Sequence, residues 1–104
     1  MFLVHSLFVD PEGMDSMEVA EMSRREASVA ATLQNQGTLV HLWRESGTRN
    51  AWGVWNAASE TGLARILASL PWSRHMEFET FEVTKHPNSV RTELPSSPTK
   101  EMCR

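Results

Sequence analysis

Residues 38–56 read TLVHLWRESGTRNAWGVWN, and this stretch decides the fold. Apolar residues alternate with other residues on both sides of a short polar segment, 46–49, that contains a glycine. This pattern predicts two antiparallel strands, at 38–45 and 50–56, joined by a hairpin loop. Strict alternation along the first strand places Leu39, His41 and Trp43 on one face and Val40, Leu42 and Arg44 on the other.

A helical segment is predicted on each side of this hairpin. The first covers residues 16–36, with Asp15 or Ser16 as the candidate N-cap and Gly37 where a C-terminal cap belongs. The second begins after Ser59, and Pro71 ends it. Its apolar residues recur at helical spacing: Leu63, Ile66, Leu67 and Leu70.

The outer segments complete a β-α-β-β-α-β order. Residues 2–9 predict a first strand that ends in the turn Asp-Pro-Glu-Gly, and residues 76–84 predict a fourth strand with a bulge between Phe78 and Phe81. This order predicts an α+β, ferredoxin-like βαββαβ fold, in which a four-stranded antiparallel sheet carries two helices on one face. We expect one domain at 1–90 and a C-terminal tail at 91–104, where prolines and serines replace the apolar pattern.

Composition excludes several classes of partner. The 104 residues suit one small domain, and a net charge of -3 without a large basic cluster argues against nucleic acid. The apolar N-terminal run is too short to cross a bilayer and lacks a basic leader, so we expect no membrane contact. The lone cysteine, Cys103, predicts no internal disulfide and a cytoplasmic location.

Glu26 is the residue whose position in the sequence indicates a candidate catalytic group. At about 100° per residue it lies in the middle of the apolar side of the first helix, whose members are Val19, Met22, Val29, Ala30 and Leu33. A carboxylate there either reaches water, pairs with an arginine across an interface, or lines a cavity with a raised pKa that suits a general base. Periodicity leaves all three open.

Other catalytic signatures are missing from the sequence. It contains no HExxH, CxxC, GxGxxG, GK[ST] or GxSxG motif, and its four histidines show no metal-ligand spacing. We therefore expect neither a metal nor a cofactor. Acid-base chemistry on a small-molecule substrate remains, with Glu26 as the candidate.

A series of short motifs resembles the muconolactone delta-isomerase family over residues 1 to about 90. An opening strand, Pro11 and Met14-Asp15 fit first. The other matching motifs are, in order, Leu33-Gln34, Gly37-Thr38, His41-Leu42-Trp43-Arg44, Gly47, Leu70-Pro71, Met76 and His86-Pro87. The order and spacing of these motifs carry the resemblance, because each motif alone is common.

The resemblance implies a cofactor-free isomerase. Members convert muconolactone to an enol-lactone in the beta-ketoadipate route of aromatic catabolism, and relatives dehalogenate chloromuconolactones. They form homodimers and can assemble into decamers, with sites at subunit contacts. Glu26 falls on the family's helix glutamate, which implies that it moves a proton between two carbons on one face of the lactone.

Several positions depart from the family pattern around the expected pocket. Ser23 replaces a lysine, Asn50 lies one place early in the hairpin, and His75 replaces an aromatic residue. Arg44 is either a clamp for the substrate's carboxylate or an ion-pair residue at an interface. The candidate substrate-binding residues are Ser23, His41, Arg44, Asn50, Trp52 and His75.

Two other functions remain open. The chain is alternatively a non-catalytic binding or assembly module, in which Glu26 forms an ion pair between subunits. It is otherwise a family relative with a different substrate, such as a dehalogenase, a lyase or an enzyme of specialised metabolism.

Overall fold

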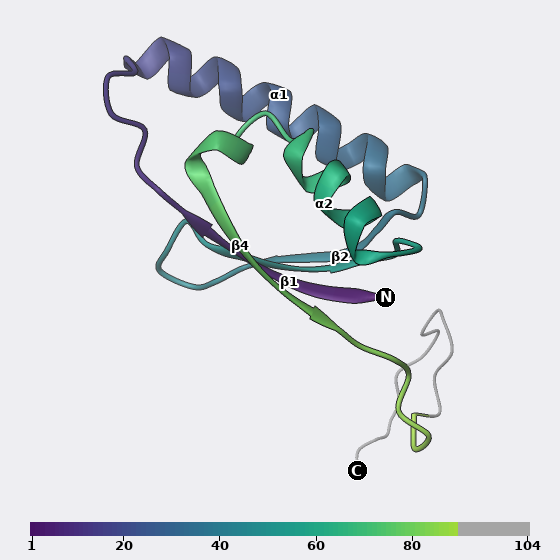
Figure 1. The fold of residues 1–104 in the computed structure, drawn as a ribbon. Coiled ribbons are helices and arrows are strands. Elements are labelled where there is room, and N and C mark those ends of the chain that lie inside the picture. The colour runs from purple at the N-terminus through teal and green to yellow at the C-terminus, as the bar shows by residue number, and fades with distance from the viewer. Residues whose placement is uncertain (90–104) are drawn as a thin grey trace, which may run out of the picture.

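The computed structural model describes residues 1–89, and these form a sheet with a layer of helices on one side (Figure 1). The elements are β1 (Phe2–Phe8), α1 (Ser16–Asn35), β2 (Leu39–Arg44), β3 (Ala51–Trp55), α2 (Glu60–Ala68), the 3-10 turn η1 (Ser73–His75) and β4 (Met76–Glu82). The strands are ordered β2-β3-β1-β4 and every neighbouring pair is antiparallel. The predicted ferredoxin-like fold is confirmed. The predicted tail at 91–104 lies outside the described residues.

Helix α1 begins and ends at strong local signals. The Asp15 side chain accepts a hydrogen bond from the Glu18 N–H at 2.8 Å, and the Glu18 side chain accepts one from the Asp15 N–H at 3.0 Å. At the other end Gly37 has a φ of 80°, and the Thr38 N–H donates to the Leu33 carbonyl at 3.0 Å. This Schellman-type ending turns the chain directly into β2.

A register shift in β2 changes which residues face the helices. It lies between Leu39 and His41 in the pairing with β3, so Leu39 is on the same side as Leu42 and Arg44. Leu39 is buried in the core, whereas Val40 is 40% exposed. The prediction that Leu39 shares a face with His41 and Trp43 was wrong, because it assumed unbroken alternation.

The bulge predicted in β4 is absent. Strands β1 and β4 pair without interruption from Phe2 opposite Glu82 to Phe8 opposite Met76. Phe78 packs against the core, while Phe81 is 49% exposed on the other side of the sheet. The two phenylalanines therefore lie on opposite faces of a regular strand.

The core lies between the sheet and the helices, toward the end of the sheet that α2 covers. Helix α2 is capped by Ser59, as predicted, and contributes the buried residues Leu63 and Leu67. The buried core residues are Phe2, Val4, Leu39, Trp55, Leu63, Leu67 and Leu70. The first half of α1 projects beyond this core (Figure 1), and no α1 residue is fully buried.

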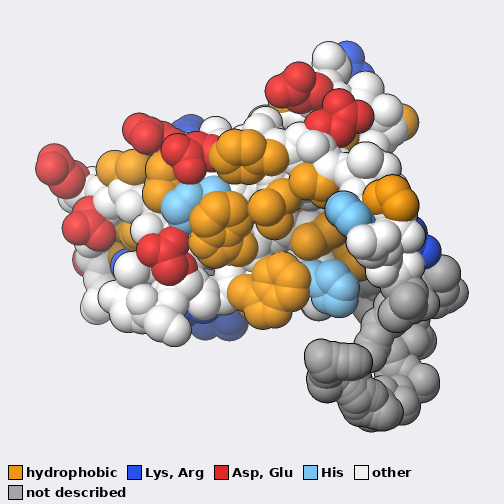
Figure 2. All heavy atoms as spheres, turned by 90° about the horizontal axis from the view of Figure 1, so that it is seen from below, with side chains coloured by type: hydrophobic (Ala, Val, Ile, Leu, Met, Phe, Trp, Pro, Cys, Tyr) orange, Lys and Arg blue, Asp and Glu red, His pale blue; other side chains and the backbone are white. Residues whose placement is uncertain are grey.

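The opposite face of the sheet has no helix over it (Figure 1). Cross-strand pairing aligns two rows of side chains on this open face: Trp43, Trp52, His5 and Glu79 form one row, and His41, Val54, Leu3 and Phe81 form the other. Figure 2 shows hydrophobic side chains gathered across this face, with acidic and histidine side chains beside them. Trp43 is 53% exposed, so the face presents large apolar groups to solvent.

Candidate active site

Glu26 lies on the side of α1 that faces the sheet, and its side chain is half-buried. Its Oε1 accepts a hydrogen bond from the backbone N–H of Trp72 at 3.0 Å. Within residues 1–89 no cationic side chain forms an ion pair with it. The predicted apolar stripe is the less exposed side of the helix, so Glu26 is a carboxylate held in mainly apolar surroundings.

Burial raises the pKa of the Glu26 carboxyl above its ordinary value, and the hydrogen bond from the Trp72 amide offsets part of this effect. The cause is desolvation of the charged form, which no nearby cation compensates. A carboxylate in this situation is a stronger base than one in water, because taking up a proton also removes the cost of the buried charge.

A cavity of about 310 Å³ opens in front of Glu26, between α1, the sheet and the segment from Leu70 to Met76. Apolar and aromatic side chains form most of its wall, and its charged groups are one carboxylate and two guanidinium groups. The lining residues are Ser6, Phe8, Ser23, Glu26, Ala27, Ala30, Leu39, Leu42, Arg44, Arg49, Ala51, Trp55, Leu70, Trp72 and Met76. A concave, mostly apolar space with a few polar groups is typical of a small-molecule site.

Phe8 and Trp72 connect the hairpin side of the cavity to the Glu26 side. The Phe8 ring meets the Trp72 ring edge-on, with centroids 5.2 Å apart. The Phe8 N–H donates to Asn50 Oδ1 at 2.9 Å, so Asn50 holds this part of β1 against the hairpin. Trp72 is buried and supplies the N–H that Glu26 accepts.

The two arginines of the cavity have no anionic partner among the described residues. Arg44, at the end of β2, and Arg49, in the loop between β2 and β3, form no hydrogen bond or ion pair there. Arg49 lies over the Phe8 ring, with its guanidinium carbon 4.1 Å from the ring centroid. Their charges are available to an anionic ligand.

The structure brings together three of the seven site residues predicted from the sequence. Glu26, Ser23 and Arg44 line the cavity, and Asn50 supports its wall through Phe8. The other three lie elsewhere in the chain: His41, Trp52 and His75.

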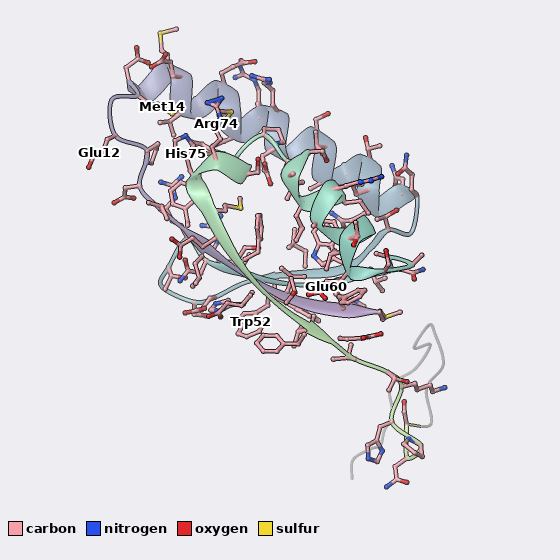
Figure 3. All side chains as sticks on the ribbon, viewed as in Figure 1. Glu12, Met14, Trp52, Glu60, Arg74 and His75 are labelled. Atoms are coloured by element: carbon pink, nitrogen blue, oxygen red, sulfur yellow. The ribbon has the colours of Figure 1, made fainter. Side chains whose placement is uncertain are left out.

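His41 and Trp52 lie on the open face, where their rings stack against Trp43 and His5 respectively. Figure 3 shows Trp52 on the side of the sheet away from the helices and His75 at the turn before β4. The His75 ring packs edge-on against Trp72 at 5.4 Å, outside the cavity lining. These three side chains do not reach the cavity.

Arg49, Phe8 and Trp72 were not singled out from the sequence. Parity along β1 places Phe8 on the same side as Val4, which was a usable signal for the cavity face. Arg49 lies in the hairpin loop, and the sequence pattern does not show toward which side of the sheet that loop bends. Trp72 contacts Glu26 through its backbone N–H, which every residue except proline carries, so its side chain gave no clue.

No group of three or more His, Cys, Asp or Glu side chains in residues 1–89 is arranged to hold a metal ion. None of the described helices is both long and apolar enough to span a bilayer.

A ferredoxin-like domain with a half-buried carboxylate facing an arginine-lined cavity has the layout of a small acid-base enzyme. Comparison with known proteins gives the particular family. The chain belongs to the muconolactone delta-isomerase family, whose model matches residues 1–89. The predicted family is confirmed, and so is the prediction of an enzyme of the isomerase class.

Individual relatives agree with this assignment. Muconolactone delta-isomerase of Pseudomonas putida is 29% identical over 83 residues, which cover 80% of this chain and 86% of the relative. Muconolactone delta-isomerase 1 of Acinetobacter lwoffii is 30% identical over 81 residues, covering 78% and 84%. A crystal structure of muconolactone isomerase superposes with a TM-score of 0.79 at 29% identity, covering 88% of this chain and 96% of that one.

Proposed function

We propose that the protein is a cofactor-free isomerase that moves a proton between two carbons of a small unsaturated lactone, with Glu26 as the proton shuttle. The observation that carries this proposal is the half-buried Glu26 carboxylate, which faces the cavity without a cationic partner among residues 1–89. Family membership supplies the lactone as the substrate class.

The reaction needs one base that can hold a proton and return it. The ionised Glu26 takes a proton from the ring carbon next to the ring oxygen, and the electron pair of that C–H bond enters the conjugated system. The lactone becomes a dienolate with negative charge on its carbonyl oxygen. Neutral Glu26 then returns the proton to the carbon α to the carbonyl, so the double bond moves and no atom is lost.

The raised pKa of Glu26 suits both halves of this cycle. A carboxyl with a very low pKa would be too weak a base, whereas partial desolvation brings its basicity closer to what the proton transfer requires. Arg44 supplies positive charge to an anionic group of the substrate, and Ser23 offers a hydroxyl at the cavity wall. The roles predicted for His41, Trp52 and His75 in substrate binding would require a second subunit to place them.

The decisive test is the variant Glu26→Gln, assayed spectrophotometrically with muconolactone and with chloromuconolactone. Gln can still accept the Trp72 N–H bond, so the fold should be kept, and turnover should fall about 100- to 10,000-fold. Turnover equal to that of the wild-type protein would show that Glu26 is not the base. An inactive wild-type protein whose Glu26→Gln variant changes oligomer size would instead support the non-catalytic assembly module.

We further propose that a second copy of the chain covers the open face of the sheet. The exposed Trp43 and Phe81, together with the row that contains Leu3 and Val54, form an apolar surface unusual for a free monomer of this size. A subunit docked there would approach the edge strand β2, whose Arg44 lines the cavity. Sites at subunit contacts, decameric assembly, a role in aromatic catabolism and a cytoplasmic location stay predictions.

A further inference from the structure

Arg49 occupies an unusual position for a loop arginine. Its guanidinium carbon lies over the Phe8 ring, 4.1 Å from the ring centroid, and the side chain lines the cavity that contains Glu26. This ring contact is the one interaction of its side chain with the described residues. Because the ring attracts the guanidinium charge without accepting an N–H in a hydrogen bond that the described residues show, the Arg49 donors are available to a ligand.

The loop around Arg49 is closed by hydrogen bonds on both sides. The Glu45 N–H donates to the Asn50 carbonyl at 2.9 Å, and the Asn50 N–H donates to Thr48 Oγ1 at 3.0 Å. The Thr48 hydroxyl in turn donates to the Glu45 carbonyl at 2.9 Å. The backbone that carries Arg49 is therefore fixed, which reduces the entropy lost when its side chain binds a ligand.

The ring beneath Arg49 is attached to the same loop. Asn50 Oδ1 accepts the Phe8 N–H at 2.9 Å, so the loop that carries the arginine is hydrogen-bonded to the strand that carries its aromatic support. The Phe8 ring also contacts Trp72, whose N–H binds Glu26. A continuous set of contacts thus relates the position of the Arg49 charge to the position of the base.

We propose that Arg49 is a substrate-binding residue that, beside Arg44, selects a lactone carrying a carboxylate over a neutral lactone. This inference rests on the proposed function and adds a specificity-determining residue to the same site. Two guanidinium groups without partners in residues 1–89 face one cavity, and a carboxylate is the group whose geometry matches the guanidinium fork.

The charges of the proposed reaction agree with two arginines. Before proton transfer, the negative charges are those of Glu26 and the substrate carboxylate. After transfer Glu26 is neutral, and the substrate carries both its carboxylate and the dienolate charge. Two guanidinium groups balance the negative charge at both stages, whereas a single arginine would leave one negative charge uncompensated in a mainly apolar space.

The test uses a pair of probes that cannot react. γ-Carboxymethyl-γ-butyrolactone lacks the ring double bond, and its methyl ester has the same framework without the charge. Binding of both probes is measured by isothermal titration calorimetry to the wild-type full chain and to Arg49→Gln, Arg49→Lys and Arg65→Gln. Arg65 is the matched control, because it is an exposed arginine on α2 outside the cavity lining.

We expect Arg49→Gln to weaken binding of the acid about 10- to 100-fold and to leave binding of the ester unchanged. Arg49→Lys should recover part of the affinity, because lysine keeps the charge but lacks the fork. Arg65→Gln should match the wild-type protein. Thermal unfolding by circular dichroism verifies that each variant is folded.

Three results would overturn the inference: equal loss of acid and ester binding in Arg49→Gln, no loss of either, or wild-type protein that does not prefer the acid. With muconolactone as substrate, Arg49→Gln should raise KM and leave kcat nearly unchanged, because the carboxylate is bound in ground state and transition state alike. The proposed function is judged separately, since Glu26→Gln should lose turnover yet still bind the acid.

Discussion

On each side of the sheet lies an ionisable side chain with a raised pKa, Glu26 of α1 on the helix side and His5 of β1 on the open side, and the causes are opposite. On the helix-covered face, burial raises the pKa of Glu26, which has no cation beside it in residues 1–89. On the open face, hydrogen bonds to Glu79 and Glu45 raise the pKa of His5. The first shift disfavours a charge, and the second favours one.

This difference separates a group suited to chemistry from one suited to structure. A desolvated carboxylate is stabilised when it takes up a proton, and taking up a proton is what a base does in catalysis. A histidine held between two carboxylates is stabilised when it keeps its proton. Its hydrogen bonds connect β1 to β4 and to the residue that follows β2. A raised pKa alone therefore does not mark a catalytic residue.

The largest effect should come from placing a charge on the open face. Trp43→Glu puts a carboxylate in the apolar surface that we propose a second copy covers, and the two-fold symmetry would bury it twice. We expect subunit association to weaken by at least about 100-fold, measured by sedimentation velocity over a range of protein concentrations.

Met17→Glu is the control for this experiment. Met17 is 80% exposed in the first turn of α1. This substitution also replaces an exposed apolar side chain by a carboxylate, but at a position away from the sheet. Association should then be unaffected. If both variants dissociate equally, or neither does, the open face is not the interface.

A smaller effect is expected on the helix-covered face, in the pH dependence of stability. The folded pKa of Glu26 is above its ordinary value of 4.5, so the stability contributed by its proton is fully present below that pH. It is lost as pH rises through the raised folded pKa. Glu26→Gln has no such loss and should be the more stable protein at neutral pH, by less than about 1 kcal/mol because the side chain is only half-buried.

Chemical denaturation of both proteins between pH 4 and pH 8, roughly the range in which carboxyl groups with raised pKa titrate, measures this difference. The difference in free energy of unfolding between Glu26→Gln and the wild-type protein should increase as pH rises and then stay constant. In the same interval kcat/KM should decrease as pH is lowered, since the ionised form of Glu26 is the base. A gap that does not depend on pH would show that Glu26 is not desolvated in the folded state.

The fold could be predicted because each element carries its own signal. Periodicity, caps at Asp15 and Ser59, and the hairpin loop together specify the βαββαβ order. The register shift before His41 could not be predicted, because an irregular residue within a strand has no signal of its own in the sequence pattern. The error at Phe81 has a related cause: a sheet with apolar side chains on both faces does not alternate cleanly.

The candidate site was only partly predictable. Glu26 was found because a carboxylate interrupts an apolar stripe, a signal that survives without coordinates. Trp52 was expected in the pocket because it belongs to the hairpin where the family resemblance implies a pocket wall, and only the register assigns it to the side of His5. Arg49 was missed because its role depends on how the hairpin loop bends toward Phe8.

The smallest effect is expected from His5 itself. Its Nδ1 lies 3.0 Å from Glu79 Oε1 and its Nε2 lies 2.8 Å from Glu45 Oε1, while its ring stacks on Trp52. Only the doubly protonated ring can donate to both carboxylates. Glu79→Gln should lower the pKa of His5 more than Glu45→Gln does, as followed by NMR titration of the ring, with His5→Gln used to assign the signal.

The sign of the accompanying stability effect follows from the direction of the shift. Because the folded pKa of His5 is above its ordinary value of 6.5, its contribution is fully present below that pH and is lost as pH rises through the folded pKa. The difference in Tm between the wild-type protein and His5→Gln should therefore be largest in mild acid, where Glu26 is protonated and its destabilising effect is smallest. A His5 that titrates at or below its ordinary pKa would show that the carboxylates do not hold it, and the contrast between the two faces would then rest on Glu26 alone.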